Sequence, residues 1–311
     1  MNTSKTSILE SSGLDISLEY ISIGKGNPKT LVLSGIHGDE RSGQLVIANL
    51  LKNFPRFSGT LNILPIANPL AYAMKQRNEP ISGQDLNRSF TGKNDGRPIF
   101  QIADVVAKMA KEHDYVFDLH GYTTAGLIQA GIRAGDGSIK MAEVLNPDVL
   151  RISHITQEYK IDGAISNILR NESVSYLLIE MPTDKRITTD QVERVANGII
   201  DHLLECSRYN TMAGSKISTR HFVRIKLIKA LTSGVFERNT TLELGKKISK
   251  DDELGILTNL PSTQQTTITS PYDGIICEME LEKICVVVAG ETLFGVGELI
   301  SDEEKWQLLR N

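Results

Sequence analysis

Short apolar runs alternate with helix-like segments through the first two thirds of the chain. Residues 30–33 form one apolar run, and residues 41–54 carry apolar side chains three and four positions apart, the spacing of one helix face. Further strands are expected at residues 61–66, 115–119 and 175–180, and further helices at residues 98–113, 138–145 and 189–206. This alternation predicts a mostly parallel α/β sheet with helices on both faces.

The pattern changes after about residue 209, where short β-rich runs are separated by Gly, Asp and Pro. These runs predict a small all-β barrel or sandwich. Two of its stretches, residues 244–255 and 285–295, are faintly similar, and they resemble the half-barrel repeat of biotinyl/lipoyl-like domains. A carrier domain needs an exposed lysine between the halves, and residues 259–266 contain none. We therefore expect an α/β domain at residues 1–210 and a β-rich domain without a carrier lysine at residues 211–311.

Composition narrows the functional classes. The chain has 311 residues, is 40% hydrophobic and 23% charged, and so suits a soluble globular protein. Its net charge of −4 and the absence of a basic run argue against a nucleic-acid partner. No apolar run approaches the length of about 18 residues that a membrane-spanning helix needs. The amino terminus lacks the apolar core of a signal peptide. The three cysteines are scattered, which suggests a reducing, cytoplasmic location.

Two side chains that bind metals follow the first expected strand. His37 and Glu40 stand three residues apart. Gly35 precedes His37 and Gly38 follows it, and these glycines let the backbone turn sharply. Zinc accepts imidazole nitrogen and carboxylate oxygen, and catalytic His₂Glu sites leave one position open for water. A surface histidine followed by a glutamate at a helix amino terminus would give the same spacing. A third ligand is needed to decide between these interpretations.

His120 supplies that third ligand. It ends the apolar strand at residues 115–119, in a setting like that of His37. Asp118 lies two residues earlier, on the same strand face, where its carboxylate can orient the imidazole. Alone, His120 would be read as a hydrogen-bonded core histidine. The other histidines lack this strand-end setting and are expected to lie on the surface or in packing contacts: His113, His154, His202 and His221.

Two further groups carry candidate chemistry. Arg77, Asn87 and Arg88 fall between the strands at residues 61–66 and 115–119, and they suit recognition of a carboxylate and stabilisation of an oxyanion. Taken alone, they would be read as surface charges on a long loop. Glu180 ends an apolar strand, where burial would raise its pKa and let it exchange a proton with water. Glu243 looks similar but is excluded because it lies in the β-rich segment.

Together, these motifs resemble the succinylglutamate desuccinylase/aspartoacylase family, a branch of the zinc carboxypeptidase-like enzymes. The resemblance covers roughly residues 30–205 and also rests on Asn68-Pro69. It implies a zinc-carboxypeptidase-like mixed sheet and one Zn²⁺ per chain. It also implies a role for each residue. His37, Glu40 and His120 would bind zinc, and Glu180 would be the general base and then the acid. Arg77 would polarise the carbonyl, and Asn87 and Arg88 would hold a substrate carboxylate.

The implied activity is hydrolysis of an amide, namely removal of an acyl group from a small N-acyl amino acid. A metallocarboxypeptidase acting on short peptides is the alternative, and a metal-dependent binding protein without turnover is a third interpretation. Three tyrosines are candidates for a substrate contact: Tyr122, Tyr159 and Tyr176. The sequence leaves open the acyl group, the amine and the choice among zinc, cobalt and manganese. The β-rich domain is expected to form the mouth of the cleft or a contact within a homo-oligomer.

Overall fold

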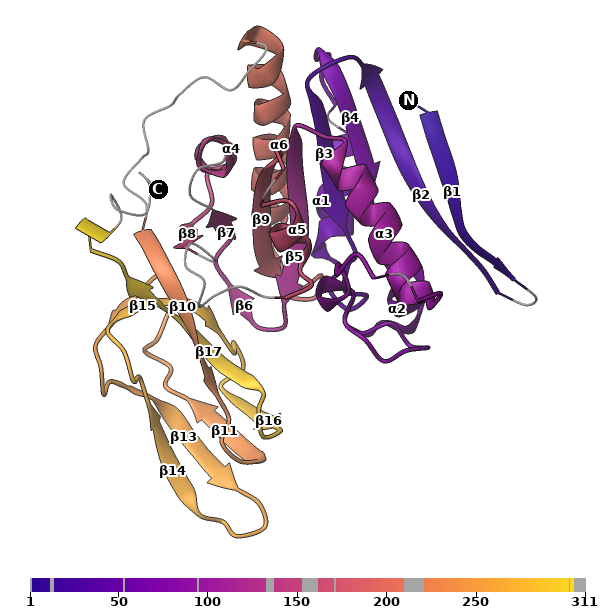
Figure 1. Ribbon diagram of the computed structural model, residues 1–311. Coiled ribbons are helices and arrows are strands. Elements are labelled where there is room, and N and C mark those ends of the chain that lie inside the picture. The colour runs from indigo at the N-terminus through magenta and orange to yellow at the C-terminus, as the bar shows by residue number, and fades with distance from the viewer. Residues whose placement is uncertain are drawn as a thin grey trace.

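The computed structural model describes residues 2–11, 14–52, 54–93, 95–132, 137–152, 162–170, 172–209, 221–301 and 303–304. In these residues, thirteen strands form one mixed sheet and four form a second, antiparallel sheet. Helices cover both faces of the large sheet, and the C-terminal strands form a β-rich extension at one end (Figure 1). The predicted fold class is confirmed.

The middle of the large sheet is parallel. Its strands run in the order β4 (Gly59–Leu64), β3 (Lys29–Ser34), β5 (Tyr115–Tyr122) and β9 (Ser175–Pro182). Each of these four begins within two residues of the predicted strand. Because the strands are parallel, the carboxyl ends of β3, β5 and β9 meet at one edge of the sheet. The register pairs His120 of β5 with Glu180 of β9 at that edge.

Two groups of helices bury the two faces. The helices on one face are α1 (Ser42–Lys52), α4 (Ser138–Leu145) and α6 (Thr189–Tyr209). Those on the other face are α3 (Pro98–Lys111) and α5 (Ile165–Ile168). The chain also forms α2 (Pro69–Met74) and the 3₁₀ turn η1 (Leu86–Arg88), both in loops beside the carboxyl edge. None of the described helices is long and apolar enough to cross a membrane.

An N-terminal hairpin extends the sheet at one edge (Figure 1). It consists of β1 (Asn2–Ser11) and β2 (Leu14–Lys25), and β2 pairs antiparallel with β4. The patterns described above do not predict either strand, although Leu14, Ile16 and Leu18 of β2 alternate with polar residues. Ile16 and Leu18 of β2 nevertheless pack into the cluster on the α3 face of the sheet, which holds the hairpin to the core.

The opposite edge joins the C-terminal strands to the sheet. From β9 the order continues with β7 (Gln129–Ile132), β8 (Val149–Ile152), β10 (His221–Lys229), β17 (Thr292–Leu299), β15 (Gly274–Met279) and β12 (Lys247–Ile248). A short strand, β6 (Ala125–Gly126), pairs with β15. The second sheet contains β14 (Gln265–Thr269), β13 (Glu253–Asn259), β11 (Gly234–Arg238) and β16 (Ile284–Val287). The C-terminal strands have their own core, which includes Phe236 and Phe294.

The division into residues 1–210 and 211–311 stays a prediction, and the boundary falls in residues 210–220, which lie outside the described residues. The β-rich segment is continuous with the α/β sheet, because β10 pairs parallel with β8 and so extends that sheet. This connection brings C-terminal strands close to the carboxyl edge where the candidate site residues gather.

Candidate active site

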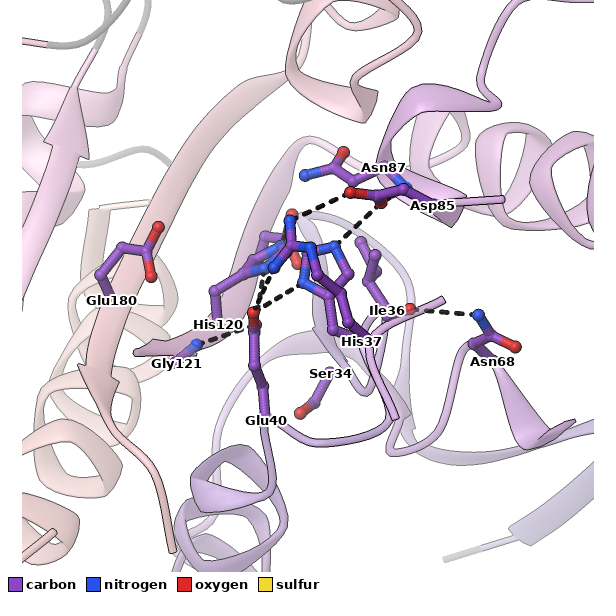
Figure 2. Close-up of polar contacts among 12 residues, drawn as sticks. Ser34, Ile36, His37, Glu40, Asn68, Asp85, Asn87, His120, Gly121 and Glu180 are labelled. Carbon is purple, nitrogen blue, oxygen red and sulfur yellow. Dashed lines mark hydrogen bonds and ion pairs between the residues drawn. The ribbon is translucent and has the colours of Figure 1, made fainter. Parts of the chain in front are cut away.

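Three side chains converge at the carboxyl ends of β3 and β5. His37 and Glu40 come from the loop after β3, and His120 lies within β5. One ligand atom of each lies within 4.8 Å of the others, a spacing that could hold a metal ion. The Glu40 carboxylate lies between the imidazoles, 2.8 Å from His37 Nδ1 and 3.0 Å from His120 Nδ1 (Figure 2). All three side chains are buried.

The loop that carries His37 is held by backbone geometry and by α2. Gly35 has φ +70°, in the left-handed region that favours glycine. A Cβ on Gly38 would lie 2.1 Å from the Ala71 backbone, so only glycine allows α2 to approach this closely. Asn68 caps α2 by accepting a hydrogen bond from Ala71 N, and its Nδ2 donates to Ile36 O at 3.3 Å (Figure 2). The Asn68-Pro69 motif therefore fixes the backbone next to His37.

An aspartate contacts the outer nitrogen of each histidine. Asp118 Oδ2 lies 3.1 Å from His120 Nε2 and also accepts a hydrogen bond from the Tyr176 hydroxyl at 2.6 Å. Asp85 Oδ1 lies 3.0 Å from His37 Nε2. Each histidine consequently presents its Nδ1 atom to Glu40. The proximity of Asp118 to His120 was predicted from the sequence, whereas that of Asp85 to His37 was not, although Asp85 belongs to the same motif as Asn87 and Arg88.

The electrostatics of this cluster favour a cation. Burial alone would lower the pKa of both histidines, but the pKa of His37 is raised by Asp85 and Glu40, and that of His120 by Asp118 and Glu40. Burial would raise the pKa of Glu40, but its hydrogen bonds with the histidines hold that pKa well below its usual range. His37 Nδ1 is buried, and its 2.8 Å contact with Glu40 Oε1 does not have hydrogen-bond geometry, which leaves this nitrogen available to a metal ion. These residues therefore fit a metal ion held by two imidazoles and a carboxylate.

Glu180 lies beside this cluster on the neighbouring strand (Figure 2). Its side chain is 20% exposed, and its Oε1 lies 3.4 Å from Arg151 Nη1 of β8. Burial raises the pKa of Glu180, and the positive charge of Arg151 opposes that rise. A carboxylate with this environment can accept a proton from water and later return it.

Arg77 reaches the cluster from the loop after α2. Its Nη1 donates to Glu40 Oε1 and its Nη2 to Asp85 Oδ2, both at 3.0 Å. Its side chain is 46% exposed, so part of the guanidinium faces solvent.

Asn87 and Arg88 belong to η1. Asn87 Oδ1 accepts a hydrogen bond from Ile165 N, and Arg88 Nη1 donates to Asn87 O. Arg77, Asn87 and Arg88 all line the same cavity as the His37–Glu40–His120 cluster.

This cavity has a volume of about 320 Å³. All the expected ligands and Glu180 line it, whereas Asp118 lies behind His120. Tyr122 and Tyr176 also line it, with their hydroxyls bonded to Leu127 O and Asp118, respectively; Tyr159 lies outside the described residues, as does His154. Four lining residues from strands beyond β9 in the sheet were not predicted from the sequence: Arg151, Ile225, Leu227 and Glu278.

Three of these residues show that the β-rich segment, whose position was the reason for excluding Glu243, does reach the cavity. Ile225 and Leu227 come from β10 and Glu278 from β15. Glu243, the residue that was excluded by that argument, is not among the described residues that line the cavity. No local signal marks Glu278, because its position depends on how β15 pairs with strands distant in sequence.

The sequence of the chain is similar to that of known amide-cleaving enzymes. The sequence model of the succinylglutamate desuccinylase/aspartoacylase catalytic domain matches residues 26–205. The N-alpha-acetyl-L-2,4-diaminobutyric acid deacetylase of Halomonas elongata is 33% identical over 108 residues, which are 34% of this chain and 31% of that protein. The match thus spans about a third of that relative's length.

Solved structures share the fold over nearly the whole chain. The ectoine utilization protein EutE (DoeB) from Ruegeria pomeroyi, in its product-bound form, has a TM-score of 0.77 and 19% identity and covers 95% of each chain. An aspartoacylase family protein from Mesorhizobium loti has a TM-score of 0.75 and 21% identity, covering 96% of this chain and 95% of that chain. Since the family model matches more than half of the sequence, the chain belongs to the succinylglutamate desuccinylase/aspartoacylase family.

Proposed function

We propose that the protein is a zinc-dependent amidohydrolase that removes an acyl group from a small N-acyl amino acid or a related amide. One observation carries the proposal: His37, Glu40 and His120 converge within 4.8 Å in a cavity that Glu180 also lines. Family membership and the deacetylase name of the Halomonas elongata relative support this class of reaction. The donor set of two imidazoles and one carboxylate supports zinc, one ion per chain.

In this proposal, His37, Glu40 and His120 would hold the zinc ion. Asp85 and Asp118 would accept hydrogen bonds from the Nε2 atoms, which would leave each Nδ1 free to bind the ion. Bound there, the ion would supply a Lewis acid that polarises a carbonyl and lowers the pKa of water.

Glu180 performs the proton transfers. It takes a proton from the attacking water and delivers it to the leaving amine, a task suited to a carboxylate whose pKa burial has raised. Arg77 holds the carbonyl oxygen as negative charge develops on it. Asn87 and Arg88 hold a carboxylate of the substrate, since an arginine fork binds carboxylate in two places.

The cavity favours a small substrate over a peptide. Its volume of about 320 Å³ lies near the lower end of the range for ligand sites. Ile225 and Leu227 of β10 add apolar walls that limit the length of a substrate. Comparing kcat/KM on N-acetyl amino acids with kcat/KM on dipeptides distinguishes the deacylase from a metallocarboxypeptidase.

The decisive variant is Glu180→Gln, which removes the base while keeping the size of the side chain. We expect kcat/KM on a panel of N-acyl amino acids to fall about 10²- to 10⁴-fold, with zinc content unchanged by elemental analysis. Glu243→Gln, which lies outside the cavity, is the matched control and should keep wild-type activity. Near-wild-type turnover by Glu180→Gln would sink the assignment of the base. A zinc-loaded wild type without activity on any amide would instead support a binding protein.

A further inference from the structure

Glu278 brings a second buried carboxylate into the cavity from the C-terminal strands. It belongs to β15, lines the same cavity as Glu180, and is only 4% exposed. The roles assigned above to the metal ligands, Glu180, Arg77, Asn87 and Arg88 leave it without a function. A buried carboxylate is costly unless it is paired, so its presence in a ligand cavity requires an explanation.

Three features of the sheet direct Glu278 into the cavity. The register between β15 and β17 shifts between Ile276 and Glu278, and such bulges re-aim side chains near active sites. A Cβ on Gly295 would lie 2.9 Å from Glu278 Cδ and 3.0 Å from its Cβ, so glycine leaves the room that this side chain occupies. Gln129 Nε2 donates a hydrogen bond to Glu278 Oε1 at 2.8 Å. Glu278 is thus held in one orientation from several sides.

Glu278 and Glu180 share this end of the cavity. Gln129, which binds Glu278, is paired directly with Glu180 in the register of β7 and β9. The Arg151 guanidinium lies 3.4 Å from Glu180 through Nη1, and its positive charge also lowers the pKa of Glu278. One guanidinium therefore acts on two carboxylates. Burial raises the pKa of Glu278, and the neighbouring Glu180 raises it further, as expected for a carboxylate short of positive charge.

From this arrangement, we infer that Glu278 forms a subsite for a cationic group of the substrate. The preferred substrate is then an N-acyl amino acid whose side chain ends in a primary ammonium. The ammonium supplies the missing counter-charge to Glu278, while the acyl amide lies between Glu180 and the His37–Glu40–His120 cluster. The position of the amide rests on the proposed function. The charge of the subsite does not depend on it.

Paired substrates of equal shape test the subsite. Nα-acetyl-L-2,4-diaminobutyrate has N-acetyl-L-norvaline as its neutral counterpart, and Nα-acetyl-L-ornithine has N-acetyl-L-norleucine. We expect the wild type to favour the cationic member of at least one pair by about 10- to 100-fold in kcat/KM, the range of a charge-assisted hydrogen bond. Glu278→Gln should remove that preference, because kcat/KM on the cationic member should fall far more than kcat/KM on the neutral member.

A control and a second variant make the result specific. Glu282→Gln removes the same formal charge from the same segment, but its side chain is 67% exposed, and the preference should persist. Glu278→Asp keeps the negative charge on a side chain that is shorter by one methylene. The preference for the cationic member should therefore be larger in the ornithine pair than in the diaminobutyrate pair. A wild type without preference in either pair would overturn the subsite. An equal loss on both members in Glu278→Gln would overturn it too, because Glu278 would then act on Glu180.

Binding of the amine products separates the two proposals. If the wild type hydrolyses no member of the panel, the proposed function fails, but calorimetry with free 2,4-diaminobutyrate, ornithine, norvaline and norleucine still measures the subsite. Tighter binding of a diamino acid that is lost in Glu278→Gln supports the cationic subsite. Equal binding of the charged and neutral amino acids contradicts it.

Discussion

Each histidine of the site has one nitrogen facing Glu40 and the other facing an aspartate. Asp85 contacts His37 Nε2, and Asp118 contacts His120 Nε2. Glu180 also has a charged neighbour, Arg151, whose guanidinium opposes the effect of burial on the pKa of Glu180. At the scale of single residues, each of these candidate site groups therefore has a partner that affects its protonation.

Arg151 gives a prediction of pH dependence. Its positive charge lowers the pKa of Glu180 against the effect of burial, so Arg151→Gln should raise that pKa. The base must be deprotonated to act, so the acid limb of the kcat/KM profile should move to higher pH while the high-pH plateau persists. Arg194→Gln is a suitable control, because Arg194 pairs with Asp148 and is not among the cavity-lining residues. An unshifted acid limb in Arg151→Gln would show that Glu180 does not limit the rate at low pH.

At the scale of elements, burial on both faces made three strands of the large sheet predictable from their apolar runs. β3, β5 and β9 read as apolar runs because helices cover both sides, and their ends carry the histidines and Glu180. β1 and β2 lack that signal, since they lie at an edge and expose polar side chains. Arg151 and Glu278 were missed for another reason. Pairings between distant strands and a bulge in β15 bring them to the site, and neither leaves a pattern in the local sequence.

The packing of α6 on the sheet yields a prediction of stability. His202 is fully buried between α6 and the sheet, near the rings of Tyr115 and Phe117, and burial lowers its pKa to about 3. The unfolded chain protonates this histidine below about pH 6.5, whereas the folded chain does not. Above pH 6.5 this group is neutral in both states, but below it protonation of the unfolded chain lowers the free energy of unfolding by about 1.4 kcal/mol per pH unit, down to about pH 3.

Replacing His202 by leucine removes the titrating group and keeps an apolar side chain. The free energy of unfolding of His202→Leu should fall less steeply between about pH 6 and pH 4 than that of the wild type, as measured by urea titration. His221→Leu serves as the control, because it removes an exposed histidine at the start of β10 and leaves the packing of α6 intact. Parallel pH profiles for wild type and His202→Leu would contradict the assignment.

At the scale of the whole molecule, the proposed zinc site ties the loop after β3 to β5, two strands in the middle of the sheet. A metal that binds only the folded chain stabilises it by mass action, by about 2.7 kcal/mol when the free ion is at 100 times its Kd. We expect removal of metal by a chelator to lower the melting temperature, and added zinc to restore it. His37→Gln and His120→Gln should melt at the same temperature with and without zinc, because each lacks one ligand. Glu180 lines the same cavity but is not a proposed ligand. The melting temperature of Glu180→Gln should therefore still rise with zinc. If Glu180→Gln lost this response and His37→Gln kept it, the ion would be held by a different set of residues.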